Sequence, residues 1–241
     1  RWEGEEEAPN ARGDCKMPAM LAPLLALTVV AQAQAVAAPP IRLAANETIV
    51  FLGDSITQQN LWTAYVETFL LSRHPNARLV FHNVGIGGNV VADGLARFDR
   101  DVAPRKPTTV VVAFGMNDGR YVPPDPAILK TYLEGQRSLL ARVRALGARP
   151  ILVAPSAVRP GHALYLEPYN GTLATFAAGL ADLARRERSA FVDLFTPFRP
   201  FAERPEREPE LVPDGVHPNA VGHFLLADAA LRRFEGPRGL G

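Results

Sequence analysis

The chain has 241 residues, enough for one domain with a substantial core, and its 47% hydrophobic and 21% charged residues are typical of globular proteins. A formal net charge of +1 gives no reason to expect a nucleic acid or an anionic membrane as a partner. The single cysteine is Cys15, so the chain after residue 40 offers neither a disulfide nor thiol chemistry.

The first forty residues carry the pattern of a secretory signal. Lys16 precedes an apolar run over 20–31, which is followed by small residues with Ala-x-Ala sites. Twelve apolar residues are shorter than the ~20 that a bilayer core requires, so we expect no stable membrane insertion. We expect 1–39 to be an upstream segment with a cleaved signal peptide and 40–241 to be the folded domain. Secretion without disulfides favours a periplasmic or extracellular bacterial protein.

After residue 45, short apolar runs alternate with longer helical patterns. The runs are rich in Val, Ile, Leu and Phe without polar alternation, which indicates strands covered on both faces, as in a parallel sheet. They are "TIVFLG" (48–53), "RLVFHN" (78–83), "TTVVVAFG" (108–115), "PILVAP" (150–155) and "AFVDLF" (190–195).

Helical patterns lie between and after these strands. Apolar side chains recur at helical spacing over 62–70. Asp125-Pro126 is typical of an N-cap and first helical residue, and Gly147 of a helix end. A further helix is expected over 168–187, and a last one after Pro218. In the last helix we expect these side chains to point inward: Val221, Phe224, Leu225 and Leu231.

The alternation of strands and helices predicts an α/β fold. We expect a single-domain, three-layer α/β/α sandwich of the flavodoxin-like kind, with right-handed crossovers and a mostly parallel five-stranded sheet. No internal repeat or shift in composition marks a second domain. The charged, proline-rich segment 199–215 is expected to be a loop.

Polar and glycine-rich segments follow the first three strands. Ser55 comes after the first, "NVGIGGN" (83–89) after the second and "GMNDG" (115–119) after the third, while "PDGVHPN" (213–219) precedes the last helix. Functional groups collect at the carboxyl ends of strands in an open parallel sheet. We therefore expect these four segments to meet in space.

The residue types in these segments suit nucleophilic catalysis. A serine hydroxyl becomes a strong nucleophile when a base, usually histidine, removes its proton, and a carboxylate orients that base. Asp214 and His217 are three residues apart in a turn and suit this pairing. The oxyanion formed on the attacked carbonyl needs donors. Gly88 and Ser55 offer backbone N–H groups, and Asn117 offers a side-chain amide.

Four neighbouring residues have simpler interpretations. We expect Asp54 and Asp118 to be structural, bonding the backbone of their turns. We expect His223 to lie at the surface or at a boundary. Tyr121 follows the oxyanion segment and could line the pocket, outside the catalytic set.

Taken together, "GDSIT", "NVGIGGN", "GMND" and "DGVHPN" resemble the four sequence blocks of the SGNH, or GDSL-type, hydrolase family. The resemblance covers 48–231. It implies Ser55 as the nucleophile and an oxyanion donor, His217 as the base and Asp214 as the residue that orients it.

The resemblance also implies the rest of the oxyanion hole, namely Gly88 and Asn117. Gly85 and Gly87 stay open as alternatives to Gly88, because all three belong to the same glycine-rich segment. The family implies hydrolysis of carboxylic esters and thioesters, including deacetylation of carbohydrates, with no metal and no organic cofactor.

Other enzyme classes fit the sequence less well. A metallohydrolase would have only Asp214, His217 and His223 as local ligands, without a His-Glu-x-x-His pattern. Val90 stands at the last glycine of the dinucleotide-binding pattern. Thr57 stands at the second glycine of the α/β-hydrolase elbow, Gly-x-Ser-x-Gly.

Several functions of the same fold stay open. We expect a serine hydrolase acting on short-chain acyl or acetyl esters, small or polysaccharide-bound. The alternatives are a thioesterase or lysophospholipase, an O-acyltransferase that uses the same acyl-enzyme, and a non-catalytic secreted binding protein. The last would have lost at least one motif residue, and all of them are present. The oligomeric state is open.

Overall fold

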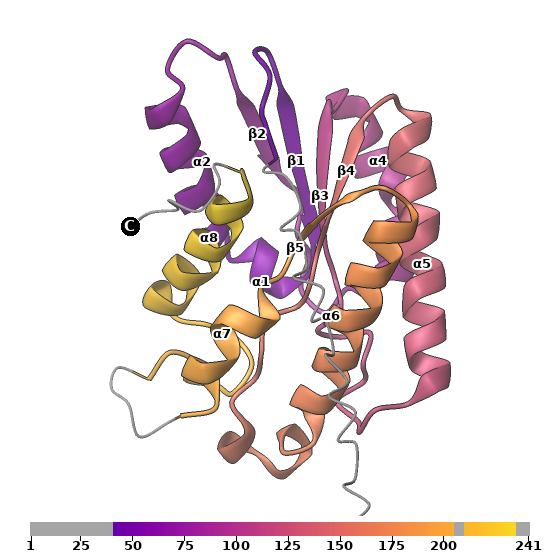
Figure 1. Cartoon of the computed structure of the whole chain (residues 1–241), viewed down its shortest axis with the longest axis vertical. Helices are drawn as coiled ribbons and strands as arrows, with labels where there is room; N and C mark the ends of the chain where they lie inside the picture. Colours follow the sequence, from indigo (N-terminus) through magenta and orange to yellow (C-terminus); the bar gives the residue numbers. More distant parts are fainter. Residues whose placement is uncertain (1–40, 205–209, 235–241) are drawn as a thin grey trace, which may run out of the picture. The chain divides into compact units, whose positions relative to one another are not determined.

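A central parallel sheet organises the computed structural model, which describes residues 41–204 and 210–234 (Figure 1). The expected signal segment, 1–39, lies outside the described residues. The strands are β1 (Thr48–Gly53), β2 (Val80–Asn83), β3 (Thr109–Ala113), β4 (Arg149–Val153) and β5 (Ala190–Val192). Their order is β2-β1-β3-β4-β5, and every pairing is parallel. The predicted five-stranded α/β fold is confirmed.

Helices cover both faces of the sheet, as Figure 1 shows. They are α1 (Ser55–Gln58), α2 (Leu61–Arg73), α3 (Val91–Ala96), α4 (Phe98–Asp101), α5 (Pro126–Ala145), α6 (Tyr169–Arg186), α7 (Phe195–Ala202) and α8 (Ala220–Phe234). Short 3₁₀ helices are η1 (Ala103–Arg105), η2 (Pro160–His162) and η3 (Leu164–Leu166). The four helices expected from the sequence correspond to α2, α5, α6 and α8. Among the described residues, no helix combines the length and the apolarity needed to cross a bilayer.

The strands separate two hydrophobic cores because successive side chains of a strand point to opposite faces. In β1, Ile49 and Phe51 join the core beneath α2 and α8, whereas Val50 and Leu52 join the core beneath α3 and α5. Both faces of the strand are therefore buried, and this explains its uninterrupted apolar sequence.

The order of the strands in the sheet determines where the predicted site residues lie. From β1 the chain crosses to β2 on one side, and β3 then returns to the other side of β1. The connections therefore diverge from the carboxyl ends of β1 and β3, and such a switch point is where open α/β sheets place their functional groups. Ser55 follows β1 and Asn117 follows β3.

Two local expectations were wrong. The segment 199–215 is not loop throughout, because α7 continues to Ala202 with its apolar side chains packed against the sheet core. In α8, Val221 and Phe224 are 48% and 43% exposed, while Leu231 is buried. The inward face instead includes Gly222, where a Cβ would lie 2.8 Å from Pro218 Cβ and 2.9 Å from the carbonyl oxygen of Leu211. The α8 helix lies beside α2 (Figure 1), and the half-exposed ring of Phe224 packs edge-on against Tyr65 of α2 at 5.8 Å.

Candidate active site

Ser55 begins α1 immediately after β1. The turn that joins the two elements is tight: a Cβ on Gly53 would lie 2.4 Å from Thr57 Oγ1 and 2.6 Å from the carbonyl oxygen of Ala113. Asp54 caps α1, because its Oδ1 accepts the backbone N–H of Ile56 at 3.1 Å. These contacts hold the serine at the end of the strand.

A chain of hydrogen bonds joins Ser55 to the segment before α8. His217 Nε2 lies 2.8 Å from Ser55 Oγ, and His217 Nδ1 lies 2.7 Å from Asp214 Oδ2. With Nδ1–H donated to the carboxylate, Nε2 is the acceptor for the serine hydroxyl. The structure therefore brings together all three residues that the sequence analysis selected, in the order that serine activation requires.

Asp214 is fixed by its own turn. Its Oδ1 accepts the backbone N–H groups of Val216 at 2.9 Å and His217 at 2.7 Å. Partial burial acts to raise the pKa of Asp214, but these two bonds and the imidazole outweigh it and lower that pKa below its ordinary value. The carboxylate therefore stays ionised beside His217.

The three candidate glycines differ in what their N–H groups do. Gly85 donates to Asn83 Oδ1 at 2.9 Å, and Gly87 donates to Gln58 Oε1 at 2.7 Å. Gly88, in a left-handed conformation with φ of +74°, has no acceptor for its N–H within the described ranges. The N–H of Ser55 is likewise without an acceptor there. Of the three glycines, only Gly88 has its N–H available for a ligand.

Asn117 follows β3 and is bonded at both ends of its amide. Its Nδ2 donates to the carbonyl oxygen of Asn89 at 3.0 Å, and its Oδ1 accepts from the hydroxyl of Tyr121 at 3.2 Å. A carboxamide nitrogen carries two N–H groups. One N–H of Asn117 thus remains for a ligand.

The sequence analysis missed Arg97, which is only 7% exposed. Its guanidinium donates to the carbonyl oxygens of Gly53 at 3.0 Å and Val84 at 2.6 Å, and to Asn89 Oδ1 at 2.8 Å. One side chain therefore ties the carboxyl ends of β1 and β2 to the glycine-rich loop. No local sequence pattern marks this role, because the bonded carbonyl oxygens belong to segments 13 and 44 residues away.

Two buried carboxyl groups lie near Ser55. Burial raises the pKa of Asp54 to about 7. Burial also raises the pKa of Asp118 to about 6, and Asp118 Oδ1 accepts the N–H of Val91 at 2.9 Å. Asp54 bonds the backbone of its own turn, as expected, whereas the bond from Val91 joins Asp118 to the start of α3.

The expectation that His223 lies at the surface or a boundary was wrong. Its exposed fraction is 0%, and its Nε2 lies 2.6 Å from Gln59 Oε1. Burial lowers the pKa of His223 to about 4, so the ring is neutral at pH 7. The residue occupies an inward position of α8, the helix whose register the sequence analysis misassigned.

Aromatic residues form one wall beside the site. The Tyr121 ring packs edge-on against Tyr165 at 5.8 Å and tilted on Tyr169 at 4.8 Å. Tyr165 is 54% exposed, and the segment around it contacts the Asp214 turn, because a Cβ on Gly215 would lie 2.6 Å from Leu166 Cδ1. Tyr121 is thus placed among the aromatic rings of this wall, and its lining of a substrate pocket stays a prediction.

The described residues contain no cluster of three or more His, Cys, Asp and Glu side chains that could hold a metal ion.

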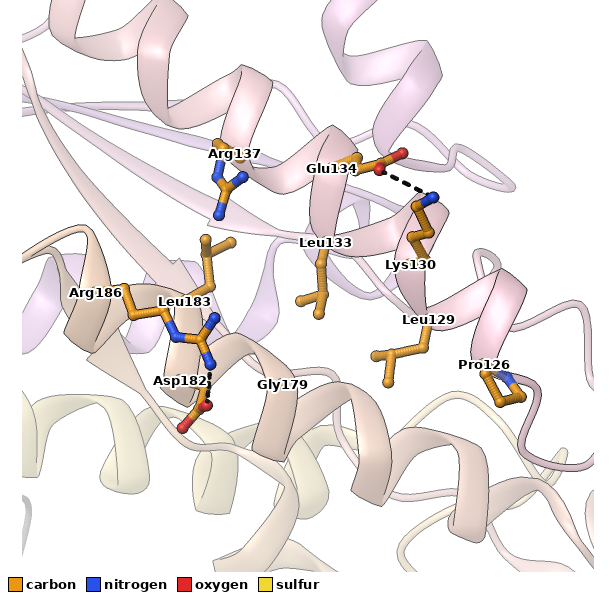
Figure 2. Close-up of a pocket in the computed structure, with 10 residues that line it drawn as sticks. All are labelled: Pro126, Leu129, Lys130, Leu133, Glu134, Arg137, Gly179, Asp182, Leu183 and Arg186. Atoms are coloured by element: carbon orange, nitrogen blue, oxygen red, sulfur yellow. Dashed lines mark hydrogen bonds and ion pairs between the residues drawn. The ribbon is translucent and has the colours of Figure 1, made fainter.

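A groove with a volume of about 380 Å³ lies between α5 and α6. Figure 2 shows Leu129, Leu133 and Leu183 among its lining and charged side chains at its rim. All its lining residues belong to these two helices, so it is separate from Ser55.

Comparison with known sequences gives a consistent result. The model of the GDSL-like Lipase/Acylhydrolase family matches residues 51–225. The chain is 28% identical to an acetylxylan esterase of Geobacillus stearothermophilus over 212 residues, which are 79% of this chain and 95% of that protein. It is 31% identical to the esterase TesA of Pseudomonas aeruginosa over 161 residues, 63% of this chain and 72% of the relative.

Solved structures agree with the sequence comparison. The crystal structure of the Geobacillus acetylxylan esterase superimposes with a TM-score of 0.69 at 27% identity, covering 80% of this chain and 95% of that one. A GDSL-like lipase structure from Parabacteroides merdae has a TM-score of 0.70 at 22% identity, covering 81% and 99%, and supports the fold alone. The chain belongs to the GDSL-like lipase/acylhydrolase family and is a carboxylic ester hydrolase of the SGNH type.

Proposed function

We propose that the protein removes short acyl groups, chiefly acetyl groups, from carbohydrate esters through an acyl-serine intermediate. The observation that carries the catalytic part is the hydrogen-bond chain from Ser55 through His217 to Asp214, at 2.8 and 2.7 Å. The acetyl-carbohydrate part is supported by the similarity to an acetylxylan esterase along nearly all of that relative's length.

The geometry supports a two-step acyl transfer. Ser55 Oγ attacks the ester carbonyl carbon while His217 Nε2 takes the hydroxyl proton. Asp214 keeps Nδ1–H oriented and stabilises the imidazolium that forms. The tetrahedral intermediate then collapses, and His217 returns the proton to the departing alcohol oxygen. In the second step water attacks the acyl-serine with His217 again as base, which releases the carboxylic acid and restores Ser55.

Three donors are assigned to the oxyanion. They are the backbone N–H groups of Ser55 and Gly88 and the second amide N–H of Asn117. Both backbone donors are unpaired among the described residues, and Gly85 and Gly87 are already engaged, so Gly88 is preferred. Donors placed before the reaction stabilise the oxyanion without reorganisation at the moment of attack.

The similarity to an acetylxylan esterase also supports a short acyl group. We therefore expect activity on p-nitrophenyl esters to fall as the acyl chain lengthens beyond a few carbons.

The acyl-serine is tested directly with a fluorophosphonate, which phosphonylates a nucleophilic serine. We expect mass spectrometry to place the adduct on Ser55 and Ser55→Ala to remove both the label and esterase activity. Ser72→Ala, at an exposed position of α2, serves as the control and should keep both. A label at another residue, or full activity in Ser55→Ala, would contradict the assignment.

The substrate class has a separate test. Acetylated xylooligosaccharides should release acetate faster than the same protein cleaves p-nitrophenyl octanoate. Faster cleavage of the octanoate ester would point to a lipase-like enzyme. Transfer of the acetyl group to added sugar without release of acetate would point to an acyltransferase.

We also propose export of the protein, on the basis of the signal-like pattern over 17–40. Expression of the full chain in a Gram-negative bacterium should yield a shortened protein in the periplasm. The new N-terminus is identified by mass spectrometry. An uncleaved cytoplasmic product would contradict export.

A further inference from the structure

The loop after Asn117 contains two unfavourable backbone conformations in succession. Arg120 and Tyr121 both have φ of 55°, in the left-handed region that favours glycine. A non-glycine residue is uncommon there, and two adjacent ones must be held by their surroundings. Such strain persists where the resulting side-chain placement matters.

The result of this backbone conformation is the position of the Tyr121 side chain. The ring is held between Tyr165 and Tyr169, with centroid distances of 5.8 and 4.8 Å. Its hydroxyl then reaches back four residues to Asn117 Oδ1 at 3.2 Å. The strained turn therefore directs a rigid donor at the amide of Asn117.

The amide of Asn117 is held at its other end as well. Asn117 Nδ2 donates one hydrogen to the carbonyl oxygen of Asn89 at 3.0 Å, and the side chain of Asn89 is bonded to buried Arg97 at 2.8 Å. With Oδ1 bonded to Tyr121, rotation of the carboxamide would break two bonds. The direction of the remaining N–H is thereby set.

We propose that Tyr121 is a positioning residue of the oxyanion hole, whose hydroxyl fixes the Asn117 carboxamide so that its free N–H points at the developing oxyanion. This inference rests on the proposed role of Asn117. A bond accepted by Oδ1 also polarises the amide, which makes its N–H a stronger donor.

The hydroxyl of Tyr121 stays a hydrogen-bond donor at neutral pH. Burial raises the pKa of Tyr121 to about 12, so the phenol is protonated throughout the neutral range. A phenolate could not donate to Oδ1, and loss of the proton would release the amide.

The first test is Tyr121→Phe, which keeps the ring contacts and removes only the hydroxyl. We expect kcat for p-nitrophenyl acetate to fall about tenfold, the upper range for one neutral hydrogen bond, with KM nearly unchanged. Affinity for an alkyl boronic acid, which forms a tetrahedral adduct on the serine, should weaken by a similar factor. Tyr65→Phe, which removes a hydroxyl on α2, is the matched control and should change neither value.

A double-mutant cycle separates this inference from the role of Asn117. In an Asn117→Ala background, Tyr121→Phe should alter kcat by less than about twofold, because its partner is gone. Equal losses in both backgrounds would overturn the Tyr121 inference while leaving Asn117 as a donor. An unchanged kcat in Asn117→Ala alone would instead overturn the proposed oxyanion hole. Thermal unfolding of each variant shows whether a loss of kcat reflects loss of fold, and a folded Tyr121→Phe with unchanged kcat would also reject the inference.

Discussion

Ser55 depends on a histidine that lies 162 residues later in the chain. Its hydroxyl is bonded to His217 Nε2, and His217 is in turn bonded to Asp214 within the same turn. The base and its carboxylate are thus positioned locally, while the nucleophile is positioned by the sheet. A substitution in the turn is expected to disturb the orientation of the base without affecting the serine.

Asn117→Ala tests the oxyanion hole at the scale of one residue. Removing one donor should lower kcat by about 10²–10³, because the lost bond forms fully only with the charged intermediate. Steady-state kinetics on p-nitrophenyl acetate measures this change. Asn89→Ala is the companion variant: its backbone carbonyl remains, so its kcat should fall less. An unchanged rate in Asn117→Ala would reduce Asn117 to a structural residue of the loop.

The sequence could indicate some of these residues and not others. Ser55, Asp214, His217 and Asn117 stand in short segments of recognisable pattern, so their selection required no contact map. Tyr121 and Arg97 act through bonds to the same segments that depend on a strained turn and on buried guanidinium geometry. Neither feature has a local sequence pattern, which explains why the role of Tyr121 and the existence of the Arg97 network were not predicted.

At the scale of elements, the junction of β1, β2 and α3 depends on one side chain. Arg97 is buried and bonds the carbonyl oxygens of Gly53 and Val84. Neighbouring Arg100 is 72% exposed and bonds only Asp101 among the described residues. The two arginines therefore form a natural comparison.

Arg97→Leu should lower the free energy of unfolding by about 2–4 kcal/mol, because it removes the guanidinium donor of the buried Val84 carbonyl oxygen, one of the two donors of the Gly53 carbonyl oxygen and the partner of Asn89 Oδ1. Arg100→Leu is the control, and its change should stay within about 0.5 kcal/mol, as for most exposed sites. Urea unfolding followed by circular dichroism measures both. Equal effects would contradict a special role for the buried guanidinium.

The helices and strands were largely predictable from the sequence, except where packing against neighbouring elements overrides the hydrophobic pattern of a helix. The strands followed from continuous apolar runs, and α6 (Tyr169–Arg186) lies within the range expected for it, 168–187. In α8 the apolar Val221 and Phe224 are exposed, whereas Gly222 is buried where the chain before the helix and Phe198 of α7 leave no room for a larger side chain. Hydrophobicity alone could not reveal which face of α8 is buried.

At the scale of the whole molecule, the buried His223 couples folding to pH in one direction, and the buried carboxyl groups Asp54 and Asp118 couple it in the other. His223 has a folded pKa of about 4, below the 6.5 of an exposed histidine, so the unfolded chain binds more protons between these values. The free energy of unfolding that depends on the neutral, buried His223 ring is therefore lost as pH falls from 6.5 to 4. Asp54, with a pKa raised to about 7, contributes stability that is lost as pH rises from 3.8 to 7.

A single variant separates the two contributions. His223→Gln keeps a polar group beside Gln59 and removes the titration, so its free energy of unfolding should fall less than that of the parent between pH 6.5 and 4. Urea titrations at several pH values measure the difference between the two proteins, in which the contribution of Asp54 cancels. His162→Gln, on an exposed 3₁₀ helix, is the control and should follow the parent. Parallel curves for His223→Gln and the parent would contradict the neutral buried histidine.

The long separation between nucleophile and base has a consequence for the timing of activity. A nascent or truncated chain that ends before His217 holds Ser55 without the imidazole that takes its proton. Such a chain should not hydrolyse esters, even when its first strands have formed. During refolding, turnover should recover only when the turn that carries Asp214 and His217 reaches the end of β1.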